Sequence, residues 1–118
     1  MKKILIADDE DILRLLIADT LEDDFDIEEA EDGKEALHKI RNNHYDLIVL
    51  DYMMPYLTGL EVLEEVRKDQ NSTRILMLTA KAQDADKEVA IEKGADYFMS
   101  KPFSPMELLE LVENILAS

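Results

Sequence analysis

The sequence predicts an α/β fold in which five strands and five helices alternate. Short apolar runs recur along the chain, segments with helical period separate them, and turn or cap residues mark the boundaries. At about 150 residues per domain, 118 residues form one domain, residues 1–118. Parallel neighbours need right-handed crossovers, so we expect a doubly wound (βα)5 sheet with helices on both faces.

The apolar runs predict the strands. Three runs are continuous, which is typical of strands covered on both faces, and a fourth is weaker; they are residues 4–7, 47–50, 75–78 and 97–99. Residues 25–30 mix apolar and acidic positions, which favours an edge strand. Placing that polar second strand at the edge and the apolar first and third strands in the middle predicts the parallel order 2-1-3-4-5.

Apolar positions with helical period lie between these strands. The five faces are Ile12, Leu13, Leu16, Ile17 and Leu21; Ala36, Leu37 and Ile40; Leu60, Leu63 and Val66; Ala85, Val89 and Ala90; and Leu108, Leu109, Val112 and Leu116. We expect Asp11 and Ser104 to cap helix starts, and Pro105 to take a first helical position. Gly94 is expected to end a helix in the left-handed conformation.

The composition excludes several classes of protein. The chain has 13 Lys and Arg against 28 Asp and Glu, a net charge of −15, which opposes direct binding of nucleic acid or anionic membranes. Because there is no Cys, disulfides, zinc fingers, iron–sulfur clusters and thiol catalysis are excluded. No apolar run approaches the ~20 residues that span a bilayer, and the start is too short for a signal peptide, so we expect a soluble cytoplasmic domain.

Polar side chains follow the predicted strands where each strand ends. Asp8 and Asp9 come after the first strand, Asp51 after the third, Thr79 after the fourth and Lys101 after the fifth. Because ligands bind at the carboxyl ends of parallel strands, we expect these side chains to converge on one site.

Three carboxylates in one site need a cation or a proton. At ~5 Å and an effective dielectric constant of ~20, each pair repels by roughly 3 kcal/mol, or about 10 kcal/mol for three pairs. Oxygen ligands without His or Cys favour a hard ion such as Mg²⁺. A metal, Lys101 and the Thr79 hydroxyl around Asp51 would suit phosphoryl transfer, with Asp51 as the acceptor.

Each of these residues also has an ordinary structural interpretation. Acids at the start of a helix are favoured by capping and by the helix dipole, and for Glu10 and Asp11 the two interpretations stay open. Thr79 alone could bond to backbone, and Lys101 alone could be a solvated surface charge. Their joint placement at the strand ends favours the functional interpretation.

Over essentially its whole length the chain resembles the receiver (CheY-like) domain of two-component response regulators. The resemblance rests on four segments in order: Asp8-Asp9, residues 51–59 (DYMMPYLTG), Thr79-Ala80 and Lys101-Pro102-Phe103. It implies the flavodoxin-like fold, and a phosphoprotein that catalyses only its own phosphorylation and slow dephosphorylation rather than a turnover enzyme.

The resemblance also implies the roles of the residues in the acidic site. Asp51 would accept a phosphoryl group from a histidine kinase or a phosphotransfer protein. Asp9, Asp51 and the Met53 backbone carbonyl would bind Mg²⁺ directly, and Asp8 through water. Lys101 would pair with the phosphoryl oxygens.

Further residues would transmit the effect of phosphorylation from the acidic site to the protein surface. Thr79, with Ala80 beside it, would turn toward the phosphoryl group, and Phe98 would follow as the aromatic switch. The resemblance implies a cis bond before Pro102. The fourth helix, fifth strand and fifth helix would then present an altered face to an output domain, a target protein or a second copy of the domain. Because the apolar Met53 side chain cannot orient water, we expect slow loss of the phosphoryl group.

Several alternatives stay open. A haloacid-dehalogenase-type phosphatase also uses a strand-end Asp with Mg²⁺, but its second Asp would fall at Met53, and its cap domain does not fit this length. A degenerate receiver would bind partners without being phosphorylated. The presence of Asp8, Asp9, Asp51, Thr79 and Lys101 together argues against this alternative. The chain is either a stand-alone regulator or a receiver from a DNA-binding transcriptional regulator, which residues 101–109 resemble.

Overall fold

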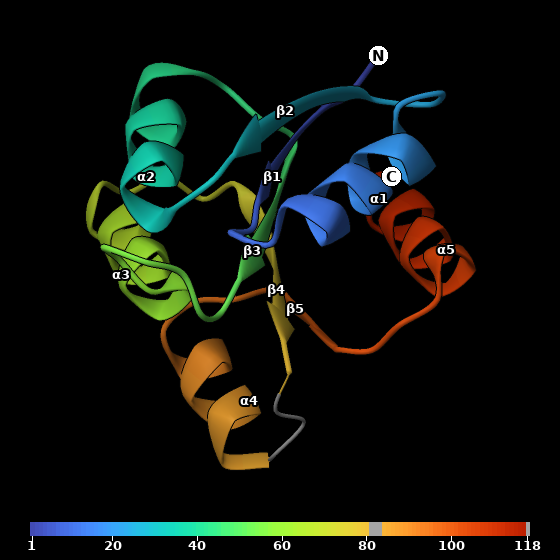
Figure 1. Cartoon of the computed structure of the whole chain (residues 1–118). Coiled ribbons are helices and arrows are strands. Elements are labelled where there is room, and N and C mark those ends of the chain that lie inside the picture. Colours follow the sequence, from blue (N-terminus) through green and yellow to red (C-terminus); the bar gives the residue numbers. More distant parts are fainter. Residues whose placement is uncertain (81–83, 118) are drawn as a thin grey trace.

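The computed structural model describes residues 1–80 and 84–117, without the side chains of residues 84–86. Strands and helices alternate along the chain as β1 (Lys3–Ala7), α1 (Asp11–Leu21), β2 (Asp26–Ala30), α2 (Gly33–Asn42), β3 (Leu47–Asp51), α3 (Gly59–Lys68), β4 (Arg74–Thr79), α4 (Asp84–Glu92), β5 (Tyr97–Ser100) and α5 (Pro105–Leu116). All neighbouring strands pair in parallel, in the order β2-β1-β3-β4-β5, which confirms the predicted topology (Figure 1).

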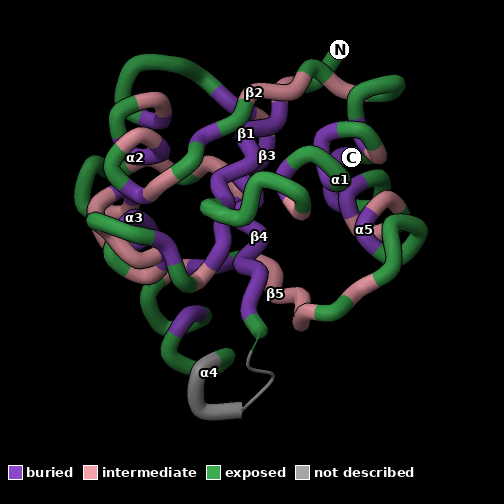
Figure 2. The backbone as a smooth tube through the Cα atoms, viewed as in Figure 1, coloured by how far each residue is buried: buried purple, intermediate pink, exposed green. Residues whose placement is uncertain are grey.

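The helices cover both faces of the sheet. Helices α1 and α5 lie on one face, and α2, α3 and α4 lie on the other (Figure 1). Successive strand residues point to opposite faces, so Ile4 and Ile6 pack toward α1 and α5 while Leu5 and Ala7 pack toward α2 and α3. The central strands are therefore buried on both sides, as Figure 2 shows, which explains their continuous apolar runs.

Most of the predicted helix ends are confirmed. The Ser104 side chain accepts a hydrogen bond from the Glu107 N–H, Pro105 begins α5, and Gly94 has a φ of 113°. The prediction for Asp11 is wrong, because Glu10 occupies the N-cap of α1 and Asp11 is already helical. The Asp11 carboxylate instead accepts a hydrogen bond from the side chain of Arg14, at 2.7 Å.

The predicted buried face of α1 is also partly wrong. Ile12 is 85% exposed and Leu16 is 43% exposed, whereas Arg14 is only 8% exposed. The helix is turned so that Ile17 and Leu21 pack on the sheet, and Arg14 can be buried because carboxylates surround its guanidinium.

The predicted face of α4 is only partly described. Ala90 is buried, as predicted, but Val89 is 37% exposed. The Ala85 side chain lies outside the described residues.

Close backbone packing fixes the loop between β3 and α3. A Cβ atom on Gly59 would lie 2.1 Å from the carbonyl oxygen of Asp51, and the Gly59 N–H donates to the Tyr52 carbonyl at 2.8 Å. On the other side of the loop, a Cβ on Gly33 would lie 2.0 Å from the Leu57 carbonyl oxygen. Only glycine permits both approaches, so the start of α3 closes directly against Asp51.

Among the described residues, none of the helices is both long enough and apolar enough to cross a membrane.

Candidate functional site

Three aspartates meet at the carboxyl end of the sheet. Asp8 follows β1 and Asp51 ends β3, and these strands are paired neighbours with Ala7 opposite Leu50. One carboxylate oxygen from each of Asp8, Asp9 and Asp51 lies within 4.8 Å of the other two. Asp8 and Asp51 are buried and Asp9 is exposed, so the cluster opens to solvent on the side of Asp9.

Lys101 reaches the same cluster from the end of β5. Its Nζ atom lies 3.1 Å from Asp51 Oδ1, 3.3 Å from Asp8 Oδ2 and 3.5 Å from Glu10 Oε1. The Lys101 backbone N–H donates to the Thr79 carbonyl at 2.7 Å, which ties the residue to the end of β4. The ammonium is largely buried, with the side chain 14% exposed. The structure therefore brings Asp8, Asp9, Asp51 and Lys101 together, as the strand order predicts.

Burial and crowding change the acidity of these groups. Burial, with the negative charge of Asp8 next to it, raises the pKa of Asp51 to about 6 in spite of Lys101. Burial also raises the pKa of Asp8, although the Glu10 N–H and Lys101 act in the opposite direction. For Lys101, burial acts to lower the pKa, but the carboxylates of Asp51, Asp8 and Glu10 outweigh it and raise the pKa.

The residues present fit a hard divalent cation. Asp8, Asp9 and Asp51 offer only oxygen ligands, and the one positive charge of the Lys101 ammonium does not by itself balance three carboxylates. Mg²⁺ favours such sites because it takes few carboxylates and keeps several waters. The exposed position of Asp9 leaves one side of the cluster open for water and for an anionic ligand.

The remaining predicted residues lie around this cluster at different depths. Thr79 is buried at the end of β4, and Ala80 after it is exposed. The Met53 side chain is 65% exposed, in the loop that Gly59 closes against Asp51. Phe98 is half-buried on β5 and packs against the core beneath α2, α3 and α4.

The peptide bond between Lys101 and Pro102 is cis, and the Pro102 side chain is exposed.

One residue close to the site has no prediction from the sequence. For Glu10 the sequence leaves a structural and a functional interpretation open, and its carboxylate lies beside Lys101. For Arg14 the sequence predicts no role, because a charged residue inside a helix is usually solvated. Its spacing gives the only available signal: it lies three residues after Asp11, where the two side chains share one helix face.

Comparison with known proteins identifies the family of the chain. A family model described as the response regulator receiver domain matches residues 4–113. The chain belongs to the receiver domain family of response regulators. These domains act in two-component signalling, and the resemblance drawn from the sequence is confirmed.

The receiver is similar to part of longer regulators. It is 47% identical over 116 residues to the alkaline phosphatase synthesis transcriptional regulatory protein PhoP of Bacillus subtilis, covering 98% of this chain and 48% of that protein. It is 44% identical over 117 residues to the CpxR homolog of Haemophilus influenzae, covering 98% and 51%. The chain thus spans about half the length of these relatives.

Solved receiver structures share the fold. The receiver domain of Francisella response regulator 1452 superimposes with a TM-score of 0.93 at 38% identity, covering 98% of this chain and 96% of that one. The chemotaxis protein CheY4 of Vibrio cholerae gives 0.91 at 37% identity, covering 98% and 99%. TrrA from Thermotoga maritima, solved in complex with Mg²⁺-BeF, gives 0.87 at 39% identity, covering 98% and 100%.

Proposed function

We propose that this receiver accepts a phosphoryl group on Asp51 from a phosphohistidine, carried by a sensor histidine kinase or a phosphotransfer protein. The observation that carries the proposal is the position of Asp51. Its carboxylate is buried at the end of β3, contacts Lys101 at 3.1 Å, and lies within 4.8 Å of oxygens from Asp8 and Asp9.

The transfer needs Asp51 as a carboxylate. An Asp51 oxygen forms a bond to phosphorus while the phosphorus–nitrogen bond of phosphohistidine breaks, and the imidazole leaves with the electron pair of that bond and takes up a proton. With its pKa at about 6, Asp51 is largely ionised at neutral pH. Lys101 then stabilises the added negative charge, since it already lies beside the acceptor oxygen.

Asp8, Asp9, Asp51 and the Met53 carbonyl would hold Mg²⁺ at this site. The bound ion supplies positive charge to the phosphoryl oxygens, which lowers the barrier to transfer. The Mg²⁺-BeF complex of the related TrrA supports this assignment.

We also propose that Thr79, Ala80 and Phe98 transmit the modification to the surface formed by α4, β5 and α5. Thr79 lies at the end of β4, and Phe98 lies on the neighbouring strand opposite Met77. Because Phe98 is only half-buried, its ring can repack at low cost when Thr79 turns toward the phosphoryl group. A shift between two arrangements of this surface would control the output partner or a phosphorylation-dependent homodimer.

An apolar surface next to the site suits the phosphoryl donor. Ile12 and Leu15 are exposed on α1, at 85% and 67%. Nearby, a cavity of about 440 Å³ is lined by Leu13, Ala80 and Phe103 among others. A helical partner carrying the phosphohistidine could bury this surface while its ring reaches Asp51.

The output that fits best is a DNA-binding domain outside this receiver. PhoP and the CpxR homolog are transcriptional regulatory proteins about twice as long as this chain. We propose that residues 1–118 form the cytoplasmic receiver of such a regulator. The receiver itself, with its charge of −15, would not bind DNA.

Acetyl phosphate tests the proposal. The receiver is incubated with acetyl phosphate and Mg²⁺, and its intact mass is measured. We expect one phosphoryl adduct that is absent with EDTA and absent in Asp51→Asn. Asp46→Asn, which changes a carboxylate bonded to the Lys3 N–H at the other end of the sheet, should keep the adduct.

Other results would contradict the proposal. No adduct on the folded wild type would indicate a degenerate receiver. Continuous release of phosphate without a lasting adduct would indicate a phosphatase.

A further inference from the structure

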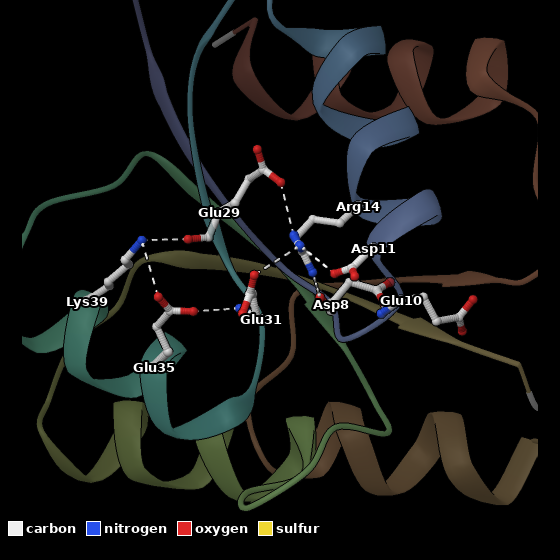
Figure 3. Close-up of polar contacts among 8 residues, drawn as sticks. All are labelled: Asp8, Glu10, Asp11, Arg14, Glu29, Glu31, Glu35 and Lys39. Atoms are coloured by element: carbon white, nitrogen blue, oxygen red, sulfur yellow. Dashed lines mark hydrogen bonds and ion pairs between the residues drawn. The ribbon is translucent and has the colours of Figure 1, made fainter.

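A buried arginine lies directly behind the acidic site. The guanidinium of Arg14 donates to the Asp8 backbone carbonyl at 2.7 Å and to Asp11 Oδ1 at 2.7 Å. It also donates to Glu29 Oε1 at 3.0 Å and to Glu31 Oε1 at 3.5 Å (Figure 3). One planar side chain thus joins the end of β1, the start of α1 and the end of β2.

Two of these bonds close the loop that carries Asp9. Arg14 bonds to Asp8 at the beginning of the loop and to Asp11 at its end, so Asp9 and Glu10 lie between two fixed points. The Asp8 N–H donates to the Ala30 carbonyl at 3.1 Å, which fixes the same residue from the side of β2. Within the loop, the Glu10 N–H also donates to the Asp8 carboxylate at 2.8 Å, so the exposed Asp9 is placed by the hydrogen bonds of its neighbours.

The start of α1 is held differently from the starts of α2, α3 and α5, because its N-cap side chain makes no capping hydrogen bond. The N-cap residues of α2, α3 and α5 are Asp32, Thr58 and Ser104, and the side chain of each accepts a hydrogen bond from a backbone N–H in the first turn of its helix. At α1 the N-cap is Glu10, whose side chain makes no capping hydrogen bond in the described structure. Instead, the Asp8 carboxylate accepts a hydrogen bond from the Glu10 N–H at 2.8 Å, and the Arg14 guanidinium, which can only donate, ties the first turn of α1 to the Asp8 carbonyl and the Asp11 carboxylate.

The acids around Arg14 are themselves held from α2. Lys39 Nζ donates to the Glu29 carbonyl at 2.5 Å, and Glu35 Oε1 accepts from the Glu31 N–H at 2.6 Å (Figure 3). The acids that Arg14 contacts on β2 and just after it, Glu29 and Glu31, are therefore held in place by hydrogen bonds between α2 and their backbone.

We propose that Arg14 is a positioning residue for the metal site. By bonding to Asp8 and Asp11 together, it holds the loop so that the Asp9 carboxylate stays near Asp51 for Mg²⁺. This inference rests on the proposed function. Groups that orient metal ligands in this way commonly change metal affinity by about 10- to 100-fold when removed.

The sign of the effect separates positioning from simple electrostatics. Arg14 carries a positive charge close to a cation site, so removing that charge should strengthen Mg²⁺ binding by Coulomb's law. Positioning predicts the opposite, namely weaker binding. Arg14→Lys keeps the positive charge but loses the planar guanidinium that bonds to Asp8 and Asp11 at once. This variant therefore tests the positioning effect separately from the charge effect.

The test is a calorimetric titration of Mg²⁺ into the metal-free receiver. We expect the Kd of Arg14→Met to rise by about tenfold, with Arg14→Lys between it and the wild type. Hydrogen exchange of the metal-free proteins provides a readout independent of phosphorylation. The amides of residues 9–11 should exchange faster in both variants.

Arg67 offers a matched control. Its guanidinium also bonds to backbone carbonyls, at 2.7 Å to Asn71 and 2.8 Å to Gly94, and to the Asp96 carboxylate at 3.0 Å. These residues precede β4 and β5, at the end of the sheet opposite to the acidic site. Arg67→Lys should therefore lower stability without changing the Kd for Mg²⁺.

The outcomes are distinct. An unchanged or lower Kd in folded Arg14→Lys and Arg14→Met would overturn the positioning role. If Arg14→Met does not fold, the Kd of Arg14→Lys for Mg²⁺ alone tests the positioning role. A wild type that binds no Mg²⁺ would instead overturn the proposed function. If the Arg67 control weakens Mg²⁺ binding equally, the effect is general loosening and the positioning role is also overturned.

Discussion

At the amino end of the sheet, where the strands begin, Asp46 accepts a hydrogen bond from the Lys3 N–H at 2.8 Å, and Lys2 Nζ donates to the Leu116 carbonyl at 2.9 Å. The Arg74 guanidinium donates to the Ile115 carbonyl. At the carboxyl end, Asp8 and Asp51 are buried and share one ammonium, that of Lys101.

The difference lies in how the charges are balanced. At the amino end, charged side chains bond to backbone groups that helices and strands leave unpaired, and so they stabilise the fold. At the carboxyl end, carboxylates crowd together, and the pKa values of Asp51 and Asp8 are raised by burial. One end of the sheet is built for stability and the other gives up stability for a ligand site.

The largest effect should come from removing the ammonium. Lys101→Met leaves Asp8 and Asp51 buried without their counter-charge, and we expect the free energy of unfolding at pH 7.5 to fall by about 4 kcal/mol. Lys2→Met, at the amino end, removes one partly exposed hydrogen bond and should cost about 1 kcal/mol or less. Urea unfolding in EDTA measures both. Equal losses would remove the distinction between the two ends.

Neutralising one aspartate at each end of the sheet should change the free energy of unfolding in opposite directions. Asp51→Asn removes a buried charge whose pKa is raised to about 6, so the metal-free receiver should gain at most about 3 kcal/mol at pH 7.5. Asp96 accepts hydrogen bonds from the Ile75 N–H at 2.9 Å and from Arg67 at 3.0 Å. Asp96→Asn should therefore lose about 1 kcal/mol. Destabilisation by Asp51→Asn in thermal unfolding would contradict this account.

The sequence predicted the carboxyl end well because strand order alone brings strand-end residues together. Asp8, Asp51 and Lys101 needed no side-chain detail beyond that rule. The helical period assigns Ile12 wrongly to the buried face and makes no prediction for Arg14, because the burial of Arg14 relies on its bond to Glu29, on a different element. Helical period identifies an apolar face only where no buried charge competes for it.

The pH dependence of stability should separate the two ends further. The pKa of Asp51 is about 6 in the folded receiver, above its unfolded value of 3.8, so its contribution to stability is full below pH 3.8 and is lost as the pH rises through 6. Without metal, we expect the free energy of unfolding to fall by about 1 kcal/mol from pH 5 to pH 7 relative to Asp51→Asn. Parallel pH profiles for the two proteins would show that Asp51 does not titrate in this range.

The smallest expected change is kinetic and lies at the exposed rim of the site. Met53→Asn would place a hydrogen-bonding amide where the wild type has an exposed apolar side chain. An added hydrogen bond to the attacking water would shorten the lifetime of the phosphoryl adduct by about threefold. Intact mass after removal of acetyl phosphate gives the decay rate. Equal decay of wild type and variant would show that the Met53 side chain has no such role.

Magnesium-dependent stability tests most directly whether the crowded carboxylates form a metal site. Urea unfolding is followed at pH 7.5 with EDTA and then with saturating Mg²⁺, for the wild type and for Asp51→Asn. At a concentration 100 times the Kd, Mg²⁺ should stabilise the wild type by about 2.7 kcal/mol and the variant far less. No stabilisation of the wild type, or an equal gain in both proteins, would contradict the assignment of the carboxyl end as a magnesium-dependent phosphoacceptor site.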